Sequence, residues 1–205
     1  MLQNLRNRNY NKAVEKAYNA LHRPYLNFTT SYLASVEQRE RDLRQLVSHP
    51  RIASITFGRG ATDNWTFDYD ASLEHNVDWM FIGTTHVTIP HAGALYAIGE
   101  FVIYITRYNS EGDLCPGVLV ENVTPLDSPV GGLRADRHQD GQDLLYAHPH
   151  CFGEIATFCM TDGKQEIINA LIEGNILETF DYVDNALRSY GPDKPFCHIS
   201  NWPTI

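Results

Sequence analysis

Two neighbouring segments rich in β-branched and aromatic residues place the strongest constraint on the fold. They cover residues 77–89, VDWMFIGTTHVTI, and residues 95–108, LYAIGEFVIYITRY. Such side chains favour extended strands because they pack well on a pleated surface. Only a short connection with turn residues separates the two segments, so we expect them to be antiparallel neighbours in one sheet.

Further strand-like segments flank this pair. IASITFG at 52–58 and NWTFDYD at 64–70 precede it, and PGVLVENVTP at 116–125 follows it. Sequential strands with short connections predict an antiparallel meander between about residues 52 and 124. The polar stretch at 125–143, rich in Gly, Asp and Pro, is long for a loop in a compact domain and therefore indicates a functional or mobile segment.

Helical patterns lie on both sides of the predicted sheet. Before it, apolar residues at helical spacing predict a helix over 11–22 that Pro24 ends, and a second helix over 30–48 capped by Thr29 or Thr30. After it, the same spacing predicts helices over 164–175 and 176–191, the second ending at Gly191 and Pro192. The order helix, meander, irregular segment, helices predicts an α+β fold.

Size and charge exclude several classes of function. A chain of 205 residues suits one domain with appendages, and its net charge of −9 disfavours binding to nucleic acid or to anionic membranes. No apolar run approaches the roughly 18 residues of a membrane span, and the start lacks a secretion signal. The four cysteines show no paired spacing, which indicates reduced thiols and a cytoplasmic protein.

The segment LLYAHPHCFGEIATFCMTDG, at 144–163, concentrates the residues able to carry chemistry, and it allows three interpretations. The first is a metal site. His148, His150 and Glu154 resemble the first half of a cupin motif, and the two histidines with Cys151 and Cys159 are possible zinc ligands. The cupin barrel needs further strands and a second histidine motif, whereas helices follow here. The second interpretation is purely structural, with hydrogen-bonded histidines in a turn and cysteines that act as small apolar residues.

The third interpretation rests on spacing. His-Pro-His occupies 148–150, Cys159 follows eleven positions after His148, and YGPDKP at 190–195 comes after the helix pair. This order resembles the ubiquitin-conjugating (UBC-like) enzymes, and among them the divergent bacterial and phage members with His-Pro-His in place of His-Pro-Asn. The resemblance extends over roughly residues 30–195, with RERDLRQLVSHP at 39–50 in the place of the family's first helix. It implies a helical extension over 1–28 and a UBC-like domain over 29–205, in which the strands from about 52 to 124 take the place of the family's four-stranded antiparallel meander.

The resemblance also implies roles for individual residues. Cys159 would be the nucleophile that takes a ubiquitin-like protein from its activating enzyme as a thioester and transfers it to an amine, without a metal or cofactor. His148 would fix the turn beside the cysteine, and His150 would supply the hydrogen bond that the family's asparagine provides. Asp162 would orient or deprotonate the incoming lysine, and Asp140 and Asp143 are further candidates for that role.

Departures from the family pattern leave a second function open. The proline-rich signature before the tripeptide is absent, the N-terminal helix is additional, and Cys151 is a rival nucleophile. If 154–160 forms a strand with Cys159 pointing inward, burial would leave the thiol inert. The alternative is therefore a catalytically silent adaptor or a structural protein, such as a subunit of a phage particle, whose partners are other subunits of the assembly. Exposure of the Cys159 sulfur decides whether the chain is an enzyme.

Overall fold

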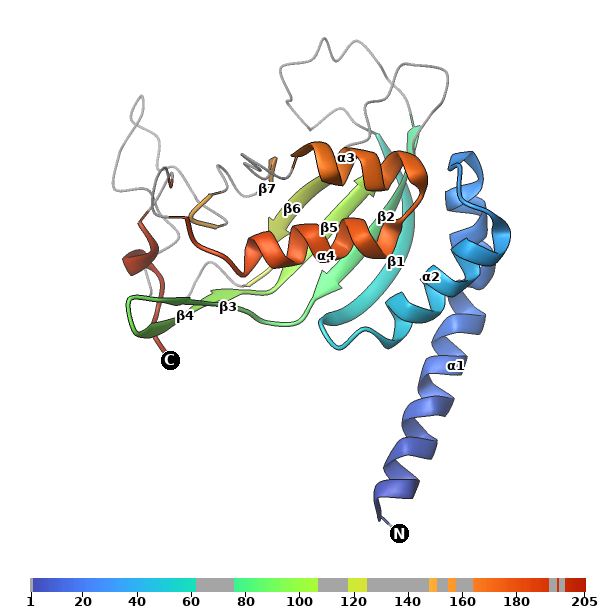
Figure 1. Ribbon diagram of the computed structural model, residues 1–205, viewed down its shortest axis with the longest axis horizontal. Helices are drawn as coiled ribbons and strands as arrows, with labels where there is room; N and C mark the ends of the chain where they lie inside the picture. The colour runs from blue at the N-terminus through green and yellow to red at the C-terminus, as the bar shows by residue number, and fades with distance from the viewer. Residues whose placement is uncertain are drawn as a thin grey trace.

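The computed structural model describes residues 2–61, 76–106, 118–124, 148–150, 155–157, 164–191, 195 and 198–205. These residues form the predicted α+β fold, in which α3 and α4 cross one face of an antiparallel sheet and α1 and α2 lie beside its β1 edge (Figure 1). The elements are α1 (Leu2–Phe28), η1 (Thr29–Ser31), α2 (Val36–Ser48), β1 (Ile52–Ala61), β2 (Asn76–Thr84), β3 (Val87–His91), β4 (Ala94–Gly99), β5 (Phe101–Thr106), β6 (Val118–Asn122), β7 (Ile155–Thr157), α3 (Lys164–Glu173), α4 (Ile176–Leu187) and η3 (Ile199–Asn201).

The main sheet has the strand order β1-β2-β5-β6-β7, and every neighbouring pair is antiparallel. The four longer strands confirm the predicted antiparallel sheet, and the three-residue β7 adds to its edge beside β6. The strand predicted over 64–70 and the loop predicted over 125–143 lie outside the described residues.

The two segments predicted as single strands are each divided in two. The strands β2 and β5 pair in the same register as β3 and β4: Gly83 pairs with Val102 in the first pair, and Thr88 pairs with Ala97 in the second. The four strands therefore belong to one long hairpin with a break between its two halves. At the break, the Phe101 N–H donates to the Thr84 hydroxyl at 3.0 Å, and Gly99 has a φ of 131°. The hairpin therefore bends at this point, and β3–β4 forms a separate two-stranded sheet.

The C-terminal segment stabilises the β3–β4 half of this hairpin. Thr204 forms a bridge with Tyr96 of β4, and the Ala97 N–H donates to the Pro203 carbonyl at 2.8 Å. Ile199 and Trp202 are buried in the main core. The end of the described chain thus holds the hairpin against the body.

Side-chain alternation explains the position of the core. Successive residues of a strand point to opposite faces, so alternate apolar positions of β2, β5 and β6 face the helices. These buried residues are Met80, Ile82, Ile103, Ile105, Val118 and Val120, and they share a core with Leu171, Ile176, Phe180, Val183 and Leu187 of α3 and α4. Residues that alternate with these along the strands point to the opposite face of the sheet, where they form a separate small cluster of Trp79, Leu119, Phe81 and Tyr104.

The first helix is longer than predicted, and the prediction that Pro24 ends it is wrong. The helix α1 runs from Leu2 to Phe28 with Pro24 inside it. A proline inside a helix costs about 3 kcal/mol, whereas burying one large apolar side chain contributes about 1.5–3 kcal/mol. Tyr25 and Phe28, both after the proline, are 0% and 4% exposed, so their burial outweighs that cost. None of the described helices, α1 included, is long and apolar enough to cross a membrane.

The second helix begins later than predicted. Ser35 caps α2 by accepting a hydrogen bond from the Gln38 N–H at 3.2 Å. The hydroxyls of Thr29 and Thr30 bond back to the carbonyls of Tyr25 and Leu26, so they close α1 rather than open α2. The helices predicted after the sheet are confirmed as α3 and α4, but α4 ends at Leu187, four residues before the predicted stop at Gly191.

The turn between α3 and α4 gives a testable measure of close packing. Gly174 has a φ of 79°, and a Cβ added to it would lie 2.6 Å from the Cβ of Tyr32. Gly93, at the hairpin tip, has a φ of 81°, but no atom lies within 4 Å of its added Cβ. We expect Gly174→Ala to lower the free energy of unfolding by about 2 kcal/mol and Gly93→Ala by about 1 kcal/mol, measured by urea unfolding. Equal losses would show that backbone strain alone, without contact to Tyr32, limits this turn.

Candidate functional site

The His-Pro-His turn is anchored by the ring of its first histidine. His148 is fully buried, its Nε2 lies 2.9 Å from the Leu187 carbonyl oxygen, and its Nδ1 accepts a hydrogen bond from the His150 N–H at 3.1 Å. An Nδ1 that accepts requires the neutral tautomer in which Nε2–H donates to Leu187. Burial lowers the pKa of His148 to about 3, although the bond to Leu187 acts in the opposite direction. His148 is therefore neutral near pH 7.

This anchor joins the turn to the end of α4. Leu187 is the last residue of α4, where helix carbonyls have no partner within the helix. The imidazole of His148 satisfies one of them and closes the turn at the same time. The ring also contacts Phe101 edge-on, with centroids 6.1 Å apart. This position suits the bracing role that the resemblance implied, and any catalytic role stays a prediction.

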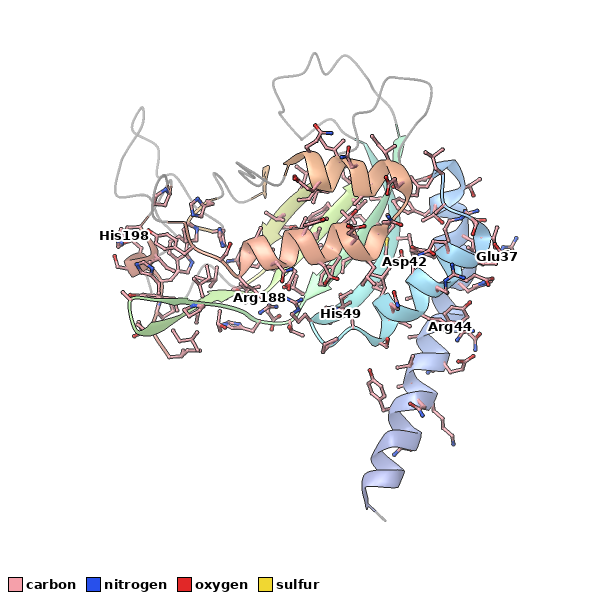
Figure 2. All side chains as sticks on the ribbon, viewed as in Figure 1. Glu37, Asp42, Arg44, His49, Arg188 and His198 are labelled. Carbon is pink, nitrogen blue, oxygen red and sulfur yellow. The ribbon has the colours of Figure 1, made fainter. Side chains whose placement is uncertain are left out.

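Two buried carboxylates fix α4, one at each end, and Figure 2 labels Asp42 at the first end and Arg188 at the second. At its start, Asp42 of α2 accepts hydrogen bonds from the Leu177 N–H at 3.1 Å and from the Tyr25 hydroxyl of α1. Near its end, Asp184 lies 2.8 Å from Arg51 Nη1 and 2.9 Å from Arg188 Nε. The guanidinium of Arg188 also donates to the His86 carbonyl at 3.1 Å, which ties α4 to the hairpin. The position of the turn therefore depends on ion pairs distant from it in sequence.

Burial also changes the titration of Asp42 and Tyr25. Burial raises the pKa of Asp42 to about 6, while its hydrogen bonds from Tyr25 and from the start of α4 oppose the shift. Burial and the neighbouring carboxyl group raise the pKa of Tyr25 well above its usual range. Tyr25 is therefore the donor in the bond between them. This bond links α1, α2 and α4.

Four aromatic side chains from separate segments meet beside the turn. The ring of Tyr190 has its centroid 4.7 Å from that of His91, 5.7 Å from that of His150 and 6.2 Å from that of His198. We call this group the tyrosine–histidine cluster. His91 comes from β3, Tyr190 follows α4, and His198 precedes η3. Sequence reasoning missed His91, because only the long hairpin brings it to this place.

His150 presents an incomplete hydrogen-bonding group within this cluster. Its buried Nε2 has no hydrogen bond of ordinary length and angle, although the Gly191 backbone lies close to it. Burial lowers the pKa of His150, and a weak hydrogen bond with the Gly191 backbone opposes the shift. A buried nitrogen that is only weakly satisfied is unfavourable, so it is able to bind a further polar group.

The remaining predicted site residues cannot be placed beside these. Cys159, Asp162, Cys151, Glu154, Asp140 and Asp143 all lie outside the described residues. Part of the strand suggested by the sequence at 154–160 is present as β7, Ile155–Thr157, and Cys159 lies outside the described residues. Both ring nitrogens of His148 are already hydrogen-bonded, so neither of them is open to a metal ion. Within the described part of the chain, no group of three or more His, Cys, Asp or Glu residues is placed to hold one.

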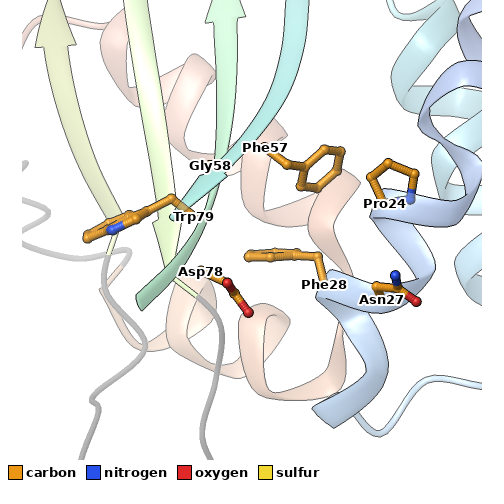
Figure 3. A pocket seen from close by; sticks show the side chains of 7 residues that line it. All are labelled: Pro24, Asn27, Phe28, Phe57, Gly58, Asp78 and Trp79. Carbon is orange, nitrogen blue, oxygen red and sulfur yellow. The ribbon is translucent and has the colours of Figure 1, made fainter. Parts of the chain in front are cut away.

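A cavity of about 360 Å³ opens between α1 and the sheet. Three aromatic side chains contribute to its lining, which consists of Pro24, Asn27, Phe28, Phe57, Gly58, Asp78 and Trp79 (Figure 3). Trp79 pairs with Thr106 at the far end of β5, whereas His148 contacts Phe101 at its start. The cavity and the His-Pro-His turn therefore lie at opposite ends of the sheet, and the cavity does not belong to the predicted site.

No protein-family model, curated protein or solved structure matches this chain.

Proposed function

We propose that this chain is a UBC-like conjugating protein that carries a ubiquitin-like protein as a thioester on Cys159 and transfers it to an amine. The observation that carries the proposal is the contact between two motifs 40 residues apart in the sequence, His148–His150 and the segment that begins at Tyr190. His148 bonds to the end of α4, and the rings of His150 and Tyr190 lie 5.7 Å apart. These are the motifs on which the resemblance rests.

The order of elements gives further support. A helix, an antiparallel sheet, the His-Pro-His turn and two helices follow one another, as in the resemblance. The bend that separates β3–β4 from the main sheet and the 27-residue helix α1 are not part of that pattern, and we regard both as additions particular to this chain.

The histidines have different roles in this proposal. His148 is neutral and fully hydrogen-bonded, so it acts as a positioning residue and takes no part in proton transfer. His150 has a ring nitrogen with no hydrogen bond of ordinary geometry, and a neutral imidazole N–H there would donate to the oxyanion that forms when the thioester is attacked. Asp162 would assist the incoming amine.

The test uses ubiquitin activated as a C-terminal thioester of a small thiol, followed by intact-mass spectrometry. The Cys159 sulfur attacks the acyl carbon, the small thiol leaves, and a new thioester forms. We expect one ubiquitin to be added and dithiothreitol to remove it. Cys159→Ser should abolish this labile adduct, because its hydroxyl gives at most an ester that resists the reductant.

Matched controls come from the other three cysteines. Cys115→Ser, Cys151→Ser and Cys197→Ser should each retain the labile adduct. The proposal fails if Cys159→Ser retains it, or if Cys159 in the native protein does not react with iodoacetamide. Retention in Cys159→Ser together with loss in Cys151→Ser would assign the chemistry to the rival cysteine.

A second function, that of a silent adaptor or assembly subunit, is favoured by one observation. The helix α1 adds to the core through Tyr18, Tyr25 and Phe28 while its outward side stays exposed. An exposed helix side suits contact with another protein. In this case Cys159→Ala would leave assembly with other subunits unchanged, as native gel electrophoresis of the complex would show.

A further inference from the structure

The outward side of α1 carries a row of exposed basic residues. Lys12, Lys16 and Arg23 are all exposed, while Tyr18 and Tyr25 are buried on the other side of the helix. At about 100° per residue the three cations fall within roughly 40° of one another, so they share one face. We call them the basic face. Within the described residues, none of the three forms an ion pair with an acidic side chain.

The basic face contrasts with the charge of the chain as a whole. From Leu2 to Phe28 there are five basic residues and one acidic residue, although the net charge of the chain is −9. The rest of the molecule is therefore strongly acidic. A net negative charge disfavours nucleic acid and anionic lipid as partners, because both would be repelled by the body. The partner that suits the basic face is an acidic protein surface.

Such a surface exists on α3 and α4 of the same chain. Glu166, Glu173 and Glu178 are exposed there, and we call them the acidic row. The Asn175 side-chain amide donates to Glu173 at 3.2 Å and to Glu178 at 3.3 Å, so the two carboxylates are neighbours. The hydroxyl of Tyr182 donates to Glu178, and the charges of Glu178 and Glu166 contribute to raising the pKa of Tyr182. Carboxylates this close repel one another and attract cations.

The spacing of the two surfaces matches. Lys16 and Arg23 are seven residues apart on α1, and Glu166 and Glu173 are seven residues apart on α3. Seven residues span about 10.5 Å along a helix, close to two full turns, so each pair lies along one side of its helix. Two helices laid side by side would therefore bring both cations to both carboxylates at once.

We propose that a second copy of this chain binds here, with the basic face of each copy on the acidic row of the other. The contact is reciprocal, so two copies close into a symmetric dimer without open ends. Exposed ion pairs contribute little one by one, and the dimer depends on several of them acting together. Its stability should therefore fall steeply as salt screens the charges.

Sedimentation equilibrium of the full chain tests this proposal, and it does not involve Cys159. We expect a dimer at about 50 mM NaCl whose dissociation constant rises at least roughly tenfold at about 500 mM. The double variant Lys16→Glu/Arg23→Glu should be monomeric, and so should Glu166→Lys/Glu173→Lys. An equimolar mixture of the two variants should associate again, because each supplies the charge that the other now needs. Recovery in the mixture excludes a general effect of net charge.

Three results would overturn the proposal. The first is a wild-type chain that stays monomeric at every concentration and salt. The second is a dimer that both double variants retain, since another surface would then form it. The third is a monomeric wild-type chain that binds double-stranded DNA, together with loss of this binding in Lys16→Glu/Arg23→Glu. A control with exposed charges elsewhere, Glu37→Lys/Glu100→Lys, should dimerise like the wild type.

Discussion

Asp184→Ala is expected to lower the free energy of unfolding by about 3–5 kcal/mol, the loss typical when one partner of a buried ion pair is removed. The Asp184 carboxylate is completely buried and contacts Arg51 Nη1 at 2.8 Å and Arg188 Nε at 2.9 Å. Without it, the partly buried guanidinium of Arg188 loses this counter-charge, and that of Arg51 keeps its longer contact with Asp181. Urea unfolding followed by circular dichroism measures the loss through the shift of the midpoint.

Asp181 provides a matched control on the same helix. Its carboxylate lies 3.6 Å from Arg51 Nη2 and 3.3 Å from His49 Nε2, and its side chain is 39% exposed. Exposed ion pairs contribute about 0–1 kcal/mol, so Asp181→Ala should change stability by less than about 1 kcal/mol. If the two variants lose equal stability, burial is not the source of the effect at Asp184.

The same variant separates stability from positioning. Asp184 and Arg188 hold the end of α4, and His148 bonds to Leu187 within that end. Under conditions in which Asp184→Ala remains folded, we expect a loosened turn and faster alkylation by iodoacetamide of Cys151, the residue that follows the turn in the sequence. The carboxylate thus links the fold to the candidate site.

The residue pattern within a segment was enough to predict those strands and helices that do not depend on contacts with distant residues. The sheet followed from β-branched runs such as residues 101–106, and α3 and α4 followed from apolar spacing. The end of α1 did not, because its passage through Pro24 depends on burial of Tyr25 and Phe28 against other elements. The bend of the hairpin was missed because β2 and β3 have the same strand-forming composition on both sides of it.

The candidate site was predictable only in part. The His-Pro-His turn was found from the spacing of its residues, and its role as an anchor was implied by the resemblance. The partner of His148 is the carbonyl of Leu187, 39 residues away, and no sequence pattern identifies a backbone acceptor at that distance. The cluster of Tyr190 with His91 and His198 likewise depends on the bent hairpin and on the C-terminal segment.

The second large effect concerns pH, because two buried groups titrate in opposite senses. The pKa of His148 falls from 6.5 to about 3 on folding. Between these pH values the imidazole is therefore protonated in the unfolded chain and neutral in the folded chain. Its contribution to stability is present above pH 6.5 and is lost as the pH falls, by up to about 1.4 kcal/mol per pH unit. The pKa of Asp42 rises from 3.8 to about 6, so its contribution is full below pH 3.8 and is lost as the pH rises through 6.

Between pH 4 and pH 6 these two contributions nearly cancel in the wild type. Asp42→Asn removes only the second, because the amide oxygen can still accept from the Leu177 N–H but carries no titrating proton. On acidification from pH 6 to pH 4 this variant should lose about 2–3 kcal/mol more stability than the wild type does. Urea unfolding at intervals across this range measures the difference.

His148→Gln should show the opposite trend. With the histidine gone, the Asp42 contribution acts alone, and the variant should gain stability relative to the wild type as the pH falls from 6 to 4. Both variants are compared by slope and not by absolute stability, so a general loss caused by the substitution does not obscure the result. Parallel pH profiles for the wild type and Asp42→Asn would contradict the prediction, because they would show that Asp42 has the same pKa in the folded and the unfolded chain. In that case acid would destabilise the wild type through His148 alone.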